Sequence, residues 1–219
     1  FLLAAAEYVQ FDELAGVPAA AAARRGLKGA DVHYAAAVVL FLLAMLAKTS
    51  VVAFPLVILL HAWWKRGTIT TRDLYRAAPF LVISLVLGLV TLAFQHDRAI
   101  GGERIPVGGA ASRLATAGMS LVWYLRLLAW PWPLLPNYPR WEVDPPRAWQ
   151  FLPWLAIAAA AWTCWRHREG WGRHAILACG FLVLMVAPVL GFVTISYMRI
   201  TWAADHFLYV PMIGLVALR

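Results

Sequence analysis

Long apolar runs separated by short polar and basic stretches dominate the chain. The clearest runs cover residues 34–47, 50–64, 77–95, 148–165 and 175–195. A helix rises about 1.5 Å per residue, and a spanning helix needs about 20 apolar residues to cross roughly 30 Å of hydrocarbon. The pattern predicts membrane-spanning helices, with the best single span at 77–95.

Both ends of the chain fall within apolar runs. Residues 1–11 read as the tail of a spanning helix, and a last span is expected to begin near Phe207. The chain starts with Phe1, and no charged segment precedes its first apolar residues. We therefore expect an internal piece of a longer protein. The fold class predicted for this piece is an all-α polytopic bundle of about six or seven transmembrane helices.

Lys48 and Thr49 interrupt an otherwise continuous apolar stretch, which is either one long helix or a hairpin of two short ones. Charge favours the hairpin, because both flanks are basic and basic flanks prefer the cytoplasm. The basic flanking residues are Arg24, Arg25 and Lys28 before the stretch and Lys65, Arg66, Arg72 and Arg76 after it. One helix would also bury Lys48 at a cost of roughly 2.5–3.5 kcal/mol. We therefore place Lys48 and Thr49 at an outer turn.

Residues 96–147 are predicted to lie outside the cytoplasm. The apolar run 114–125 is short for a span and favours a helix along the membrane surface. Residues 129–149 hold repeated prolines, which remove backbone donors, so this stretch is predicted to be extended. If 114–130 crossed the membrane, the basic loop 166–174 would be forced outside, against the positive-inside rule.

Composition agrees with a membrane protein and excludes several other classes. Apolar residues make up 63% of the chain and charged residues 14%, whereas soluble domains are about half apolar and a quarter charged. The net charge of +8 comes mainly from short loops, without a basic face or an RNA-binding motif, so no nucleic-acid partner is expected. Cys164 and Cys179 lie in apolar runs and are read as packing residues. No metal site and no cofactor are predicted.

Several stretches resemble a known family in the same order. They are LAMLAKTSVVAFPLVILLHAWW (43–64), RAAPFLVISLVLGLVTLAFQ (76–95), WYLRLLAWPWPLLPNYP (123–139) and AADHFLYVPMIGL (203–215). Together they resemble the polytopic membrane part of bacterial tetratricopeptide-repeat proteins related to the transmembrane and tetratricopeptide-repeat O-mannosyltransferases, in the GT-C glycosyltransferase superfamily. The chain departs from this pattern at Thr49, where the family has Pro or Glu, and at His206, where it often has Arg.

The resemblance implies a bacterial inner-membrane domain, a partial GT-C-like unit over 1–219. It would take a sugar from a polyprenyl-phosphate donor and pass it to a protein or other acceptor outside the cytoplasm. The catalytic acidic residue of such enzymes would lie in a loop upstream of Phe1, and the repeats would follow Arg219. Asp12 and Glu13 fall in the predicted cytoplasmic connection 12–33 and are not candidates for this role.

Two groups of residues are candidates for binding the lipid phosphate. Lys48 and Thr49 place a cation and a hydroxyl at the outer turn, where they can stabilise a phosphate leaving group; the alternative is that Lys48 only reaches the membrane interface. Asp205, His206 and Tyr209 open the last predicted span, with Arg199 in the loop before it. For this group the alternative is that Asp205 caps a helix, that His206 lies at the headgroup level and that Arg199 is solvated.

Two other functions compete with sugar transfer. The chain is alternatively a non-catalytic membrane anchor or scaffold whose attached repeats recruit partners. A transporter is less favoured, because the sequence shows no inverted repeat and few intramembrane charges besides Lys48.

Overall fold

The computed structural model describes the chain except residues 17–28, 101–104, 136 and 217–219, so the predictions for Arg24, Arg25 and Lys28 lie outside the described residues. Every regular element in the described ranges is a helix. The longer helices are α1 (Leu2–Leu14), α3 (Ala30–Ala47), α4 (Phe54–Arg66), α5 (Thr71–Phe94), α6 (Ala110–Ala129), α7 (Leu152–Arg166) and α8 (Trp171–Val186). The shorter ones are η1 (Thr49–Val51), η2 (Gln95–Ile100), η3 (Ala148–Phe151), η4 (Ala187–Val189), η5 (Ser196–Arg199), η6 (Asp205–Phe207) and α9 (Ile213–Val216).

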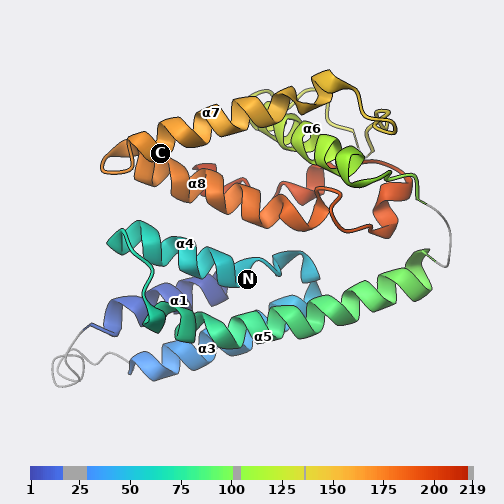
Figure 1. The fold of residues 1–219 in the computed structure, drawn as a ribbon. Coiled ribbons are helices and arrows are strands. Elements are labelled where there is room, and N and C mark those ends of the chain that lie inside the picture. The colour runs from blue at the N-terminus through green and yellow to red at the C-terminus, as the bar shows by residue number, and fades with distance from the viewer. Residues whose placement is uncertain (17–28, 101–104, 136, 217–219) are drawn as a thin grey trace.

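The helices form two groups that meet where α4 faces α8 (Figure 1). Helices α1, α3, α4 and α5 make one group, and α6, α7 and α8 make the other, with α9 against α8. An aromatic core holds the first group together: the rings of Phe41, Phe54 and Phe80 come from α3, α4 and α5, with centroids 5.0–5.6 Å apart. Aromatic pairs of this kind contribute about 0.5–1.5 kcal/mol each beyond the area they bury.

The turns of the bundle gather at two ends (Figure 1). What we call the Lys48 end carries η1, η2, the starts of α6 and α7, and η4 to η6. What we call the basic end carries the turn between α4 and α5 and the turn between α7 and α8. Lys65 and Arg66 close α4 there, and Arg166 closes α7. Cations at helix C-termini are favourable because they face the negative end of the helix dipole.

Three helices are long and apolar enough to cross a membrane, which indicates a membrane protein. They cover Ala30–Ala47, Thr71–Arg98 and Trp171–Val189, with mean hydropathies of 2.0, 2.4 and 1.7. Helices α1 and α4 have 13 residues each and α7 has 15, so their lengths are only about 20–23 Å. A bundle of six or seven spans is therefore not established and stays a prediction.

The break at Lys48 is confirmed. Helix α3 ends at Ala47, the backbone of Lys48 is extended, and the short turn η1 leads into α4. The chain reverses there, since Phe41 of α3 contacts Phe54 of α4. Residues 34–64 are thus two helices rather than one.

The predicted connection 12–33 is wrong at its start. Helix α1 continues to Leu14, and Asp12 lies in its last turn with 6% of its side chain exposed. Its carboxylate accepts Lys65 Nζ at 2.7 Å, and Arg66 and Arg76 each approach it to 3.4 Å. Three cations from α4 and α5 let this carboxylate remain in the helix, where the polar character of Asp12 and Glu13 had suggested a loop.

Two other predicted boundaries are also wrong. The span expected at 175–195 begins at Trp171 and leaves the α-helix after Val186, because Pro188 breaks it and Gly191 then adopts a φ of 102°. The helix expected from Phe207 begins only at Ile213. Pro211 accounts for this delay, because a proline disfavours helical backbone in the residue before it.

Helix α6 is longer than the apolar run that predicted it, and its first turn lies at the Lys48 end. The Trp154 indole of α7 donates to the Leu114 carbonyl at 2.8 Å, and the Arg113 guanidinium donates to the Phe192 carbonyl at 2.9 Å. Farther along α6, Tyr124 is fully buried and accepts the Ala204 amide at 3.3 Å. The position of α6 and of residues 96–147 relative to the membrane stays a prediction.

Candidate functional site

Lys48 lies between the end of α3 and the start of the short turn η1. The α3 helix stops because Lys48 turns extended, and its amide still donates to the Ala44 carbonyl at 2.9 Å. At this break Lys48 lines two neighbouring cavities. A cation that would be costly inside a spanning helix is thereby placed at a helix end.

His206 reaches the same place from the other end of the chain. It lies in η6, between the ring of Tyr197 at 5.3 Å and the ring of Phe207 at 4.2 Å. Burial lowers the pKa of His206 below its ordinary value of 6.5, the charge of Lys48 lowers it further, and Asp205 opposes the shift. The ring is therefore neutral at pH 7, so it can offer one N–H donor beside the fixed charge of Lys48.

Lys48 and His206 form a shared wall between the two cavities. The larger cavity is about 450 Å³ and lies against α5, with Thr49, Gln95 and Ser196 among its polar lining residues. The smaller is about 260 Å³ and is lined mainly by apolar side chains from α3, α8 and the segment after η6. Both cavities are mainly apolar, and a cation and a neutral imidazole in the wall between them suit a molecule with a polar head and an apolar chain.

Asp205 holds the proline-rich segment to this site. Its carboxylate accepts the Tyr138 hydroxyl at 2.6 Å, and the Tyr138 ring packs on Trp123 of α6. Burial raises the pKa of the Tyr138 hydroxyl, and the bond to Asp205 raises it further. The hydroxyl therefore stays protonated and keeps donating. Asp205 thus anchors residues next to the cavities, and it is not among the residues that line either of them.

The remaining sequence candidates are dispersed. Thr49 lines the larger cavity. Arg199 is directed to the Ile100 carbonyl, to which its guanidinium donates at 2.6 Å, and it lines neither cavity. Tyr209 is 64% exposed and also lies outside both. The structure therefore brings together Lys48, Thr49 and His206, with Asp205 adjacent.

The sequence reading missed several polar lining residues. Ser50 lines both cavities, and Gln95 lines the larger one, where its side-chain oxygen accepts the Ser196 amide at 3.1 Å. In the sequence, Gln95 is distinguished only as the last residue of the apolar run 77–95. A polar residue that closes an apolar helix just before a loop is the signal that could have drawn attention to it.

The described lining of the two cavities holds no Asp or Glu. Across the described residues, no group of three His, Cys, Asp or Glu side chains is placed to hold a metal ion. The site thus offers positive charge and hydrogen-bond donors rather than an acid–base pair. No family model matches the chain, and no curated protein or solved structure matches it.

Proposed function

We propose that this chain is part of an integral-membrane glycosyltransferase that takes a sugar from a polyprenyl-phosphate donor and transfers it to a protein or other acceptor on the extracytoplasmic side of a bacterial inner membrane. The observation that supports this most is the pairing of Lys48 with His206 in the walls of two adjoining cavities. The four stretches that resemble the GT-C superfamily supply the choice of sugar chemistry.

The proposed roles follow from the charge changes of sugar transfer. As the acceptor hydroxyl attacks the anomeric carbon, the bond from that carbon to the phosphate oxygen breaks and negative charge grows on the leaving phosphate. The Lys48 ammonium would stabilise this charge, and the imidazole N–H of His206 would donate to the same phosphate. The proton of the acceptor hydroxyl needs a base, which the resemblance places upstream of Phe1.

The alternative proposal is a non-catalytic membrane anchor for partner-binding repeats. One observation favours it: no carboxylate is found among the described residues that line the two cavities. In that case the cavities would bind a lipid without turning it over.

A transfer assay distinguishes the two proposals. Membranes containing the full-length protein are supplied with labelled sugar on polyprenyl-phosphate donors, and the label that reaches acceptors is measured. Lys48→Gln removes the charge and keeps the length of the side chain, and His206→Gln keeps a hydrogen-bond donor. Arg98→Gln, an exposed cation of η2 outside both cavities, serves as the matched control.

The enzyme proposal expects Lys48→Gln to slow transfer by about 100-fold, the scale for removing one group that stabilises developing negative charge. A smaller loss is expected for His206→Gln, and none for Arg98→Gln. Transfer that is unaffected by Lys48→Gln would rule out this phosphate site. Absence of transfer with every donor, while the protein still binds partners, would support the scaffold.

A further inference from the structure

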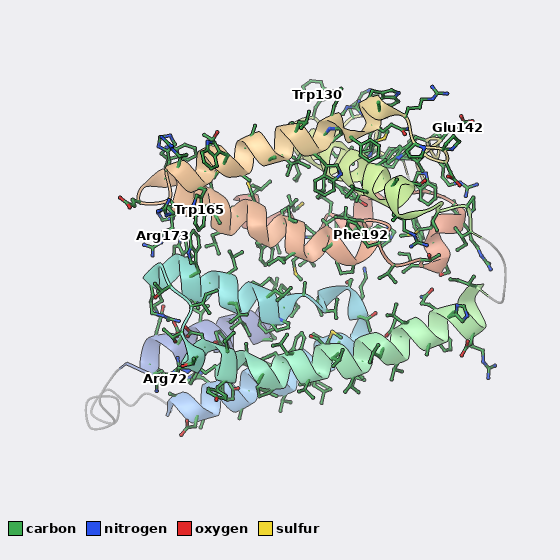
Figure 2. The ribbon with its side chains drawn as sticks, in the orientation of Figure 1. Arg72, Trp130, Glu142, Trp165, Arg173 and Phe192 are labelled. Atoms are coloured by element: carbon green, nitrogen blue, oxygen red, sulfur yellow. The ribbon has the colours of Figure 1, made fainter. Side chains whose placement is uncertain are left out.

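A surface of exposed tryptophans and arginines lies at the basic end, away from the proposed sugar site. Trp162 and Trp165 on α7 and Trp171 on α8 are 63%, 48% and 56% exposed. The Arg166 guanidinium lies 5.8 Å from the Trp162 ring, and that of Arg168 lies 4.9 Å from the Trp165 ring. We call these five residues the Trp–Arg surface. Figure 2 labels Trp165 at this end, near Arg173.

The Trp–Arg surface is joined to the other helix group. The Trp63 ring of α4 stacks on Trp165 at 5.9 Å with an angle of 11° between the rings. Arg173 of α8 donates to the Trp63 carbonyl at 3.4 Å. The Trp165 indole is therefore held against α4, and α8 is tied to α4 beside it, which reduces the entropy that Trp165 loses when a ligand binds.

Charge at this surface is strongly one-sided. Residues 166–174 carry Arg166, Arg168 and Arg173 against a single carboxylate, Glu169. Arg168 also donates to the Trp165 carbonyl at 3.1 Å, which fixes its guanidinium beside the indole. A stacked guanidinium keeps its N–H groups in a planar fork that matches a phosphate.

The exposed face of α7, which carries most of this surface, indicates which kind of anion the surface binds. No residue of α7 is buried, and Leu152 and Leu155 are 58% and 68% exposed. This apolar face suits hydrocarbon, and the exposed indoles at the C-terminal end of the same helix suit the headgroup level. From the charge complementarity and the apolar face together, we propose that the Trp–Arg surface binds anionic phospholipid headgroups of the cytoplasmic leaflet.

Native mass spectrometry of the protein in detergent tests this proposal by measuring retained phosphatidylglycerol against phosphatidylcholine. The double variant Arg166→Gln/Arg168→Gln removes two charges from the surface. We expect about fivefold weaker phosphatidylglycerol binding for each arginine lost, and about 25-fold for both, with phosphatidylcholine unaffected. The matched control is Arg98→Gln/Arg147→Gln, which removes the same charge at the Lys48 end.

Three results would overturn the proposal: equal retention of the two lipids by the unaltered protein, full retention of phosphatidylglycerol by the double variant, or an equal loss in the control. A dimer that dissociates in the double variant would assign the surface to a second copy instead. The proposal rests on the membrane character of the chain and not on sugar transfer. Loss of lipid binding here with transfer intact would therefore leave the function of the Lys48 end unaffected.

Discussion

The charges of Lys48 and Asp205 act on His206 in opposite directions, and their balance with burial fixes the sign of its pH dependence. Its pKa is below 6.5 in the free site because burial and the charge of Lys48 outweigh Asp205. A bound phosphodiester would favour the protonated ring and raise that pKa. The gain in binding is then fully present below the pKa of the free site and fades as the pH rises through the pKa of the complex.

We therefore expect a polyprenyl-phosphate sugar to bind more tightly as the pH falls from about 8 to about 5. Dissociation constants measured across this range on the protein in detergent test the expectation. His206→Gln should flatten the profile. A profile that is equally steep in this variant would mean that a group other than His206 is responsible.

Asp12 holds α1 to α4 and α5 through the cations of Lys65, Arg66 and Arg76. Burial alone would raise the pKa of Asp12, but the hydrogen bond and charge of Lys65, with Arg66, lower it overall. Its contribution to stability is thus present above the unfolded pKa of about 4 and is lost as the pH falls through the folded pKa. Asp12→Asn is expected to reduce stability by about 1–2 kcal/mol, since two of its partners are about one-third exposed.

Thermal unfolding in detergent should show this loss as a melting temperature lower by about 3–6 °C. The control is Glu13→Gln, because Glu13 is the exposed neighbouring carboxylate and forms none of the ion pairs of Asp12. Equal melting temperatures for Asp12→Asn and the unaltered protein near pH 7 would contradict the proposed role of the cluster.

Between elements, the turn that joins α7 to α8 depends on Gly172. A Cβ atom at this position would overlap the Cys164 carbonyl oxygen and lie 2.7 Å from the His167 carbonyl carbon. Both are backbone atoms, so no side chain can move aside to make room. Gly172→Ala is therefore expected to cost about 1–3 kcal/mol, the usual price of overpacking.

Gly109→Ala provides the comparison, since a Cβ atom there meets nothing within 4 Å. Unfolding midpoints of the two variants should differ by several degrees in favour of Gly109→Ala. A Gly172→Ala protein as stable as the Gly109→Ala protein would show that α7 and α8 can separate at this turn without loss.

Sequence reasoning was strongest where one physical effect dominates an element. The break at Lys48 was predictable because a cation inside an apolar helix is costly, and η1 lies there. The full length of α6 was not predictable from the apolar run 114–125, because the polar Ser112 that precedes the run looks exposed in the sequence and is buried in the structure. The Thr116 hydroxyl is satisfied within its helix by donating to the Ser112 carbonyl at 2.9 Å, a contact that the apolar pattern does not reveal.

The candidate site was predictable only in part, for a similar reason. Lys48, Thr49 and His206 were singled out and line one cavity. Arg199 and Tyr209 were singled out by their positions in the same loop and predicted helix. In the structure the Arg199 side chain binds the Ile100 carbonyl and the Tyr209 side chain is exposed, so neither lines a cavity. Which residues of adjacent turns face a cavity depends on the packing of η5 and η6, and no sequence pattern specifies that packing.

At the scale of the whole molecule, the placement of α6 decides which side each later turn faces. Helix α6 starts near the start of α7, as the bond from Trp154 to Leu114 requires. If α6 does not cross the membrane, Glu142 lies outside the cytoplasm and Glu169 lies inside. If α6 does cross, both positions are reversed. The arginines around Glu169 would then violate the positive-inside rule, and the turn between α7 and α8 would lie across the membrane from the turn between α4 and α5, although Trp165 and Trp63 stack at the same end of the bundle.

Labelling of single cysteines measures this directly. In a background with Cys164→Ala and Cys179→Ala, we expect a membrane-impermeant thiol reagent to label Glu142→Cys in intact cells. Glu169→Cys should be labelled only after the membrane is opened. Asp31→Cys, at the start of α3, should be labelled only after the membrane is opened in either arrangement, because it precedes α6 and because the crossings predicted for α3 and α4 return the chain to the same side before α5. Labelling of Glu169→Cys but not Glu142→Cys in intact cells would make α6 a spanning helix and would place the Trp–Arg surface outside the cytoplasm.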